Sequence, residues 1–475
     1  GWGEGPAVAR ALDGRSWLDS VDGGAGWGLL GRARLALGDT EAGAAALDRY
    51  LSLAELEAGE RGLAQLRRGV ALSRAEETAE ALEAFDRAAE LMPWFADWAS
   101  YLAAESAARA GDPVEVDRRL AAAGEVGRGS WRLRVGAALT AGDTMAAREA
   151  ALAATRRGSR GDRSEAWAEL GRLRLEVGDR ARARDAFGRA MEVRSSAGAV
   201  EAARRLSEMS PGPEEWRTIA SVYQWHGNGT RAADGYERYL DSGVGTDDER
   251  AQTRLQLGRA RFAAGHYVQA ERGLRALTES TVPDRIAAEA LYLLARAQYR
   301  QGRSTAGEAT FVRLAERYPG EDATARGLYL LADLKHDDLE TDGPTGARTY
   351  FRRAADASPD LNEAGLALMR LAGLAFLDGD YRGAVEIWEE YRARHADGRR
   401  AAQATYWAAR AYRELDQPAR AEELLREIRD EDPLSFYGMR AAERLGQSVL
   451  DLPLAESPPR DARADSMVRD GLRRV

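Results

Sequence analysis

The chain of 475 residues has no cysteine and only one lysine, Lys335. The missing cysteine excludes disulfides, thiol catalysis and zinc–thiolate sites. No apolar run approaches the roughly 18 residues of a membrane-spanning helix, so the sequence predicts no transmembrane segment. Runs of β-branched residues are also few. Alanine, leucine, glutamate and arginine dominate instead, and this composition favours helix throughout the chain.

Positively charged residues are fewer than negatively charged ones. The net charge is −9 and the pI is about 5.4. Because phosphate binding requires clustered positive charge, we expect no nucleic-acid partner. The strongly basic residues other than Lys335 are all arginine. A GC-rich genome explains this bias, and the alternative is that forked guanidinium donors meet carboxylate ligands.

A Gly-Asp pair recurs between predicted helices, and a small or slim residue follows each glycine five positions later. Glycine can end a helix in the left-handed conformation, and the adjacent aspartate can cap the next helix. The pairs are Gly38-Asp39, Gly111-Asp112, Gly142-Asp143, Gly178-Asp179 and Gly379-Asp380, and the small residues are Gly43, Val116, Ala147, Ala183 and Ala384. This spacing predicts successive helix-turn-helix units.

These units resemble the tetratricopeptide repeat, in which Trp and Leu-Gly precede Ala, an aromatic residue and Pro. The clearest example has Trp167, Leu170 and Gly171, followed by Ala183 and Phe187. The small residue on the first helix lets the second helix approach closely, and the large residue fills the gap between them. The resemblance implies an all-α fold: an α-solenoid of tetratricopeptide-like helix-turn-helix repeats, superhelical or ring-closing.

The repeat pattern also predicts the organisation of the chain. We expect a helical superhelix of about 11 helix pairs over residues 1–447, with an extra helix within 197–212. Pro453, Pro458 and Pro459 favour an exit linker over residues 448–475, toward a C-terminal domain that this chain lacks.

Residues 336–346 are predicted to form a polar insertion between the two helices of one unit. Within it, Asp338, Glu340 and Asp342 are spaced like the start of a calcium loop, with Gly343 next. The position of the closing bidentate glutamate is Thr349. Because that ligand is missing, we expect a solvated acidic insertion, with calcium binding as the alternative.

Four arginines cluster between two units: Arg156, Arg157, Arg160 and Arg163. One interpretation is that they interact with the negative C-terminal end of the preceding helix. The other is that they form a patch that binds an anionic ligand.

Other motifs do not indicate chemistry. Residues 26–31 spell GxGxxG, but nucleotide binding requires a preceding strand, and here the stretch opens a repeat. The four histidines lie far apart in sequence, and two of them flank turn glycines: His226, His266, His336 and His395. Five tryptophans fall at core positions of repeats, with ligand stacking as the alternative to packing: Trp27, Trp131, Trp167, Trp216 and Trp388. We therefore predict no catalytic, cofactor-binding or metal-binding residue.

Two segments near the end of the chain carry a further resemblance. Residues 404–412 read Ala-Thr-Tyr-Trp-Ala-Ala-Arg-Ala-Tyr, and residues 432–446 read Asp-Pro-Leu-Ser-Phe-Tyr-Gly-Met-Arg-Ala-Ala-Glu-Arg-Leu-Gly. The pair is similar to the end of the helical superhelix in bacterial soluble lytic transglycosylases. That resemblance implies a periplasmic protein that acts on peptidoglycan without metal or cofactor.

In that family the catalytic glutamate lies in a following domain, in a Glu-Ser motif followed by Gly-Leu-Met-Gln. Glu105-Ser106, Glu279-Ser280 and Glu456-Ser457 are not followed by it, so no catalytic residue is carried over. The resemblance implies a non-catalytic scaffold that positions the catalytic domain and the glycan strand. The alternative is a stand-alone scaffold of the cell envelope, with a peptide or protein partner in a concave groove.

Overall fold

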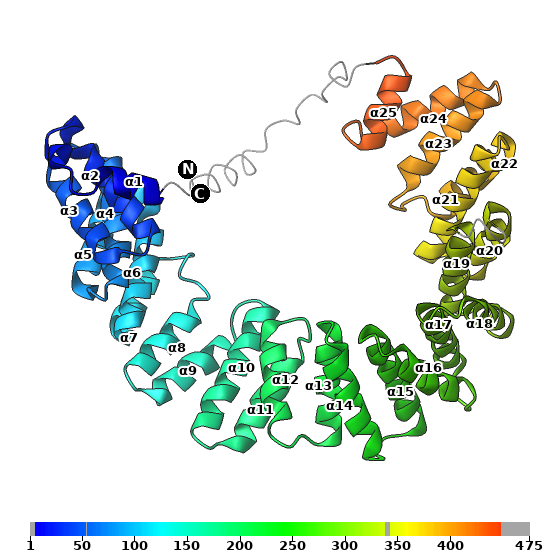
Figure 1. The fold of residues 1–475 in the computed structure, drawn as a ribbon, viewed down its shortest axis with the longest axis horizontal. Coiled ribbons are helices and arrows are strands. Elements are labelled where there is room, and N and C mark those ends of the chain that lie inside the picture. The colour runs from blue at the N-terminus through cyan, green and yellow to red at the C-terminus, as the bar shows by residue number, and fades with distance from the viewer. Residues whose placement is uncertain (1–4, 54, 338–342, 448–475) are drawn as a thin grey trace. The chain divides into compact units, whose positions relative to one another are not determined.

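The computed structural model describes residues 5–53, 55–337 and 343–447, and every regular element in these residues is a helix. The chain divides after Ser210 into two compact units, and each is described by itself below. Unit 1 runs from the N-terminus through Ser210, and unit 2 begins at Pro211. The predicted all-α solenoid of helix pairs is confirmed, and consecutive helices lie side by side within each unit (Figure 1).

Unit 1 contains an N-terminal helix, five helix pairs and a final single helix. Its α-helices are α1 (Gly5–Leu12), α2 (Ala25–Ala36), α3 (Thr40–Leu53), α4 (Ala58–Arg74), α5 (Thr78–Leu91), α6 (Ala96–Ala110), α7 (Pro113–Ala122), α8 (Trp131–Thr140), α9 (Thr144–Ala154), α10 (Arg160–Glu176), α11 (Arg180–Met191) and α12 (Ala197–Ser207). Short 3-10 helices cover Ser16–Asp19, Asp22–Gly24 and Pro93–Phe95.

The described residues of unit 2 form six helix pairs and one last single helix. Its helices are α13 (Pro213–Trp225), α14 (Gly229–Asp241), α15 (Asp247–Ala263), α16 (Tyr267–Thr278), α17 (Asp284–Arg300), α18 (Ser304–Arg317), α19 (Asp322–Asp337), α20 (Gly343–Ala357), α21 (Asn362–Leu377), α22 (Tyr381–Arg394), α23 (Ala401–Glu414), α24 (Pro418–Glu431) and α25 (Phe436–Arg444).

The predicted Gly-Asp turns form as the sequence indicates. Gly178 has a φ of 78°, in the left-handed region, and ends α10. Asp179 then accepts a hydrogen bond from the backbone N–H of Arg182 in the first turn of α11, at 3.2 Å. The other four Gly-Asp pairs repeat this arrangement. The glycine has a positive φ, and the aspartate side chain accepts a hydrogen bond from a backbone N–H in the first turn of the following helix. Each turn therefore ends one helix and starts the next.

A glycine on the first helix of a pair sets how closely the second helix packs. A Cβ on Gly171 would stand 2.5 Å from the Phe187 ring, which is fully buried. The same juxtaposition occurs in three other pairs, with the large residue sixteen positions after the glycine: Gly31 with Leu47, Gly69 with Phe85, and Gly258 with Leu274. Hence the missing side chain on one helix is filled by the large side chain of the other.

In unit 2 the first helices of neighbouring pairs also contact each other. Helix α15 contacts α17, α17 contacts α19, and α19 contacts α21. These first helices therefore share one face of the unit, and the second helices α18 and α20 lie to the right of α17 and α19 in the view of Figure 1.

Two expectations about connections had different outcomes. The extra helix within 197–212 is confirmed as α12, which packs on α10 and α11 and closes unit 1. The predicted insertion over 336–346 is wrong at both ends, because α19 continues to Asp337 and α20 begins at Gly343. Residues 338–342 lie outside the described residues, as do 448–475, where the exit linker stays a prediction.

Candidate functional site

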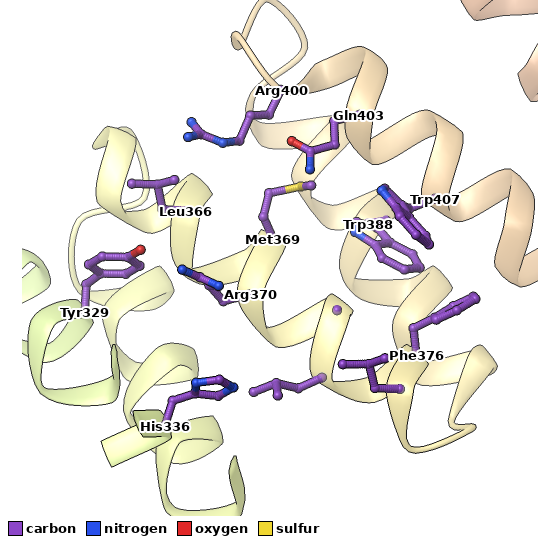
Figure 2. Close-up of a pocket in the computed structure, with 13 residues that line it drawn as sticks. Tyr329, His336, Leu366, Met369, Arg370, Phe376, Trp388, Arg400, Gln403 and Trp407 are labelled. Carbon is purple, nitrogen blue, oxygen red and sulfur yellow. The ribbon is translucent and has the colours of Figure 1, made fainter. Parts of the chain in front are cut away.

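The first-helix face of unit 2 carries an open pocket of about 680 Å³. Helix α19 contributes Tyr329 and His336 on one side, while Phe376, Trp388 and Trp407 gather on the other (Figure 2). The volume falls within the range of sites that hold small ligands or a few residues of a peptide.

Helix α21 forms the floor of the pocket, because its lining residues are spaced so that they share one face of the helix. Leu366, Met369, Gly373 and Phe376 recur at three- or four-residue intervals and therefore lie on one face of the helix. Gly373 has no neighbouring atoms where a side chain would stand, so it leaves the middle of the pocket open. At the end of the helix, Leu377 is 81% exposed despite its apolar side chain.

The aromatic wall is built from three helices. The Phe376 ring on α21 lies 5.8 Å from Trp388 on α22 and 5.6 Å from Trp407 on α23. The two indoles are stacked, with centroids 6.4 Å apart. The Arg410 guanidinium lies over the Trp407 ring, 4.9 Å from its centroid. This packing fixes the orientation of the rings and gives the pocket a rigid apolar surface.

The charged side chains that line the pocket are basic. Arg370 and Arg400 are among the thirteen lining residues, together with His336, and no carboxylate is. Arg370 lies 3.7 Å from Asp333 in an exposed ion pair, which is weak in water. Arg400 forms no ion pair with any described residue. The lining is therefore mostly apolar, and two arginines are its ionic side chains.

Trp388 is also a buried donor without an acceptor. It is only 2% exposed, and its Nε1 has no hydrogen-bond partner among the described residues. Buried indole N–H groups usually find a partner. An occupant of this pocket that supplied an acceptor would satisfy it.

The four clustered arginines lie at the turn between α9 and α10 or in the first turn of α10. Arg157 is the one of the four that lines a cleft of about 590 Å³ in unit 1. Binding of an anionic ligand by the four arginines together stays a prediction.

The histidines are also apart. His226 and His266 lie in the turns that follow α13 and α15, as expected. His336 lines the pocket described above, and His395 packs on the Tyr391 ring at 5.1 Å, where burial lowers its pKa. No group of three potential metal-ligating side chains occurs in the part of the chain that the structure describes.

The proposed calcium ligands Asp338, Glu340 and Asp342 lie outside the described residues. Gly343 and Thr349 belong to α20, so a loop does not extend to the closing position. Residues 26–31 lie in α2, where glycines 28 and 31 face Tyr50 and Leu47 of the next helix. Their role is helix packing, as the sequence indicates.

The tryptophans divide into two groups. Trp131 and Trp388 are buried, as predicted for core positions. Trp27, Trp167 and Trp216 are half-buried, and the first two pack against core clusters, in agreement with the predicted packing role. Arginine guanidinium groups lie over the rings of Trp167 and Trp216, 5.0 and 4.6 Å from the ring centroids, and shield part of the apolar ring surface from water.

Most pocket residues were not predicted from sequence. Tyr329, Met369, Arg370 and Gln403 occupy ordinary helix positions, and the lining residues named in the sequence analysis are His336, Trp388 and Trp407. The sequence feature that could have indicated the pocket is Leu377, an apolar residue directly before the turn that ends α21.

These features define an α-solenoid of helix-turn-helix repeats, a class of fold in which stacked helix pairs form an extended surface. A family model described as Tetratricopeptide repeat matches residues 29–93, 255–322 and 374–436. No curated protein matches the sequence. No helix in the described part of the chain is sufficiently long and apolar to cross a bilayer.

Two solved structures match most of the chain, with low TM-scores. The crystal structure of yeast Tom70 matches with a TM-score of 0.33 and 13% identity, over 93% of this chain and 95% of that one. The structure of Naa15/Naa10 bound to HypK-THB matches with a TM-score of 0.28 and 16% identity, over 94% of this chain and 71% of that one. At these scores neither likeness bears on function.

Proposed function

We propose that this chain is a scaffold that binds a peptide segment of a partner protein in the pocket of unit 2. The observation that carries the proposal is the open pocket itself, with an aromatic wall and an exposed Leu377. Exposed apolar surface bounded by polar groups marks interaction sites, because its burial is favourable.

The chemistry of the lining defines the peptide. An apolar side chain of the partner enters between Met369 and Phe376, where it removes apolar surface from water. Acidic residues beside that anchor meet Arg370 and Arg400, which line the same pocket. Because guanidinium groups bind carboxylates with two parallel hydrogen bonds, these pairs add orientation as well as affinity.

A selection from a random peptide library tests the proposal. The full chain is immobilised, and enriched peptides are measured by fluorescence anisotropy. We expect peptides with an apolar anchor next to acidic residues, and about tenfold weaker binding to Leu377→Glu because the new carboxylate repels them and is desolvated. The matched control is Val114→Glu on α7 of unit 1, at a residue that is 80% exposed and outside the pocket. Equal binding by both variants would refute the site.

A second candidate function is the non-catalytic scaffold of a periplasmic lytic transglycosylase. Its support is that the two segments of the resemblance lie on α23 and α25 and pack together, with the Tyr406 and Tyr437 rings 5.5 Å apart. In this case arginines such as Arg370 meet the carboxylates of peptidoglycan stem peptides. Co-sedimentation of the full chain with purified sacculi tests it. Binding that Arg370→Glu weakens is expected, and a chain that stays in the supernatant contradicts it.

A further inference from the structure

A second cleft, of about 590 Å³, lies in unit 1 between α7, α8, α9 and the start of α10. Alanines of α9 form one wall: Ala150, Ala153 and Ala154. The opposite wall is the connection from α7 to α8. A Cβ on Gly127 would stand 2.4 Å from the Leu120 carbonyl oxygen, so glycine is required for this close approach. Small side chains on both walls therefore leave the space open.

Trp131 brings a buried donor to this cleft. The residue is 8% exposed and lines the cleft, and its Nε1 has no hydrogen-bond partner among the described residues. The Arg132 guanidinium lies over the ring, 4.7 Å from its centroid, and holds the indole in place. Buried N–H groups in folded proteins are usually hydrogen-bonded, so this indole is available to donate to an acceptor from outside the chain.

Only one of the three arginines in the cleft lacks an acidic partner among the described residues. Arg128 pairs with Glu125 at 2.6 Å, and Arg134 pairs with Asp117 at 2.6 Å. Arg157 lines the cleft without an ion pair to any described residue. The lining thus offers one unpaired guanidinium and one unpaired indole N–H.

One carboxylate also lines the cleft, but it is already engaged. Asp162 accepts hydrogen bonds from the backbone N–H and the hydroxyl of Ser159, at 3.0 and 2.7 Å. It lies in the first turn of α10, where the positive end of the helix offsets its charge. Asp162 is therefore not the missing partner of Arg157.

We propose that this cleft binds a small monocarboxylate with a compact aliphatic body. One carboxylate oxygen accepts from the Trp131 indole and the other from the Arg157 guanidinium. Because the other two arginines are paired and Asp162 adds negative charge to the lining, the cleft accommodates one carboxylate and not two. The alanine wall accommodates the aliphatic part. This site is independent of the peptide pocket in unit 2, since none of its residues belongs to that unit.

Indole NMR spectra of the full chain test the proposal. The chain has eleven tryptophans, and Trp131→Phe assigns the signal of interest by its disappearance. If that variant does not fold, Arg132→Ala assigns it instead, because removal of the stacked cation shifts the same resonance. The probe is N-acetyl-alanyl-alanine with a free carboxylate. We expect it to move the Trp131 N–H signal downfield, as a new hydrogen bond would.

The controls separate the site from general surface charge. Arg157→Ser should weaken binding of the probe about tenfold, since the substitution removes a charge-assisted hydrogen bond. Arg156→Ser, which makes the same charge change one residue away but outside the cleft, should leave affinity within about twofold. An unmoved Trp131 signal or equal weakening by the two variants would overturn the proposal. So would equal shifts with the C-terminal amide of the probe or with inorganic phosphate alone.

Discussion

Replacing Gly171 with alanine should destabilise unit 1, although alanine is the better helix former. The new Cβ would stand 2.5 and 2.6 Å from two ring carbons of Phe187. Real Cβ contacts are essentially never shorter than 3.0 Å, so either the ring or the helix must shift. Phe187 is fully buried between α10 and α11, and its ring therefore has no free space to enter.

The magnitude follows from two opposing terms. Overpacking of a well-filled core costs about 1–3 kcal/mol, and the full burial of Phe187 favours the upper half of that range. The gain in helix propensity from glycine to alanine is about 1 kcal/mol. The net effect is a loss of about 1–2 kcal/mol from the free energy of unfolding.

Gly188→Ala provides the matched control. Gly188 is one residue after Phe187 on the same helix, is exposed, and has no neighbouring atom within 4 Å of the place where a Cβ would stand. Here only the propensity term acts, and we expect a gain of about 0.5–1 kcal/mol. The two alanines should therefore change stability in opposite directions.

Hydrogen exchange measured by mass spectrometry on peptides from α10 and α11 is the suitable assay, because stability in repeat arrays is local. Gly171→Ala should reduce protection there about tenfold, which corresponds to about 1.4 kcal/mol. Phe187→Leu in the same chain should restore part of the loss by making room. If Gly171→Ala were as protected as the parent chain, close approach at this glycine would not explain the packing of the pair.

Other predictions concern the cap, the core and the acid response. Asp179→Ala should cost about 1 kcal/mol in urea unfolding, because α11 loses its N-terminal hydrogen bond; an unchanged midpoint would contradict the cap. Phe351→Ala should cost about 3–5 kcal/mol by the same measurement, because the ring is fully buried and leaves a cavity; a loss below about 1 kcal/mol would contradict this. Hydrogen bonds from Arg118 and Arg119 lower the pKa of Glu115 to about 2. The ionised carboxylate therefore adds about 1–3 kcal/mol to the free energy of unfolding above pH 4.5, and this contribution is lost as the pH falls through 2. The difference in stability from Glu115→Gln should shrink over that window, and a constant difference would refute the linkage.

Much of the fold was accessible from local sequence. The Gly178-Asp179 turn combines a residue that tolerates positive φ with one that caps a helix, and both effects act within a few residues. The sixteen-residue step from Gly171 to Phe187 is also local, because the two residues meet across a single turn. Such signals survive in one sequence because they depend on neighbours along the chain.

The candidate sites were much less accessible. Tyr329, Arg370 and Trp407 come from three helix pairs, and their proximity depends on how each pair is rotated against the next. Arg157 was noted as part of a cluster, yet its difference from Arg156 is only which side of a turn it faces. Residue type cannot distinguish these positions.

The sequence by itself determined the helix pairs, their turns and the residues that fill the space within each pair, because those features follow from spacing along one or two helices. Tertiary structure alone decided which side chains meet between pairs. It left Trp131 and Trp388 without hydrogen-bond acceptors among the described residues and placed arginines without ion pairs to those residues in the same clefts. The physical reason is that helix-to-helix rotations are fixed by the sum of many small packing contacts, and no single residue specifies that sum.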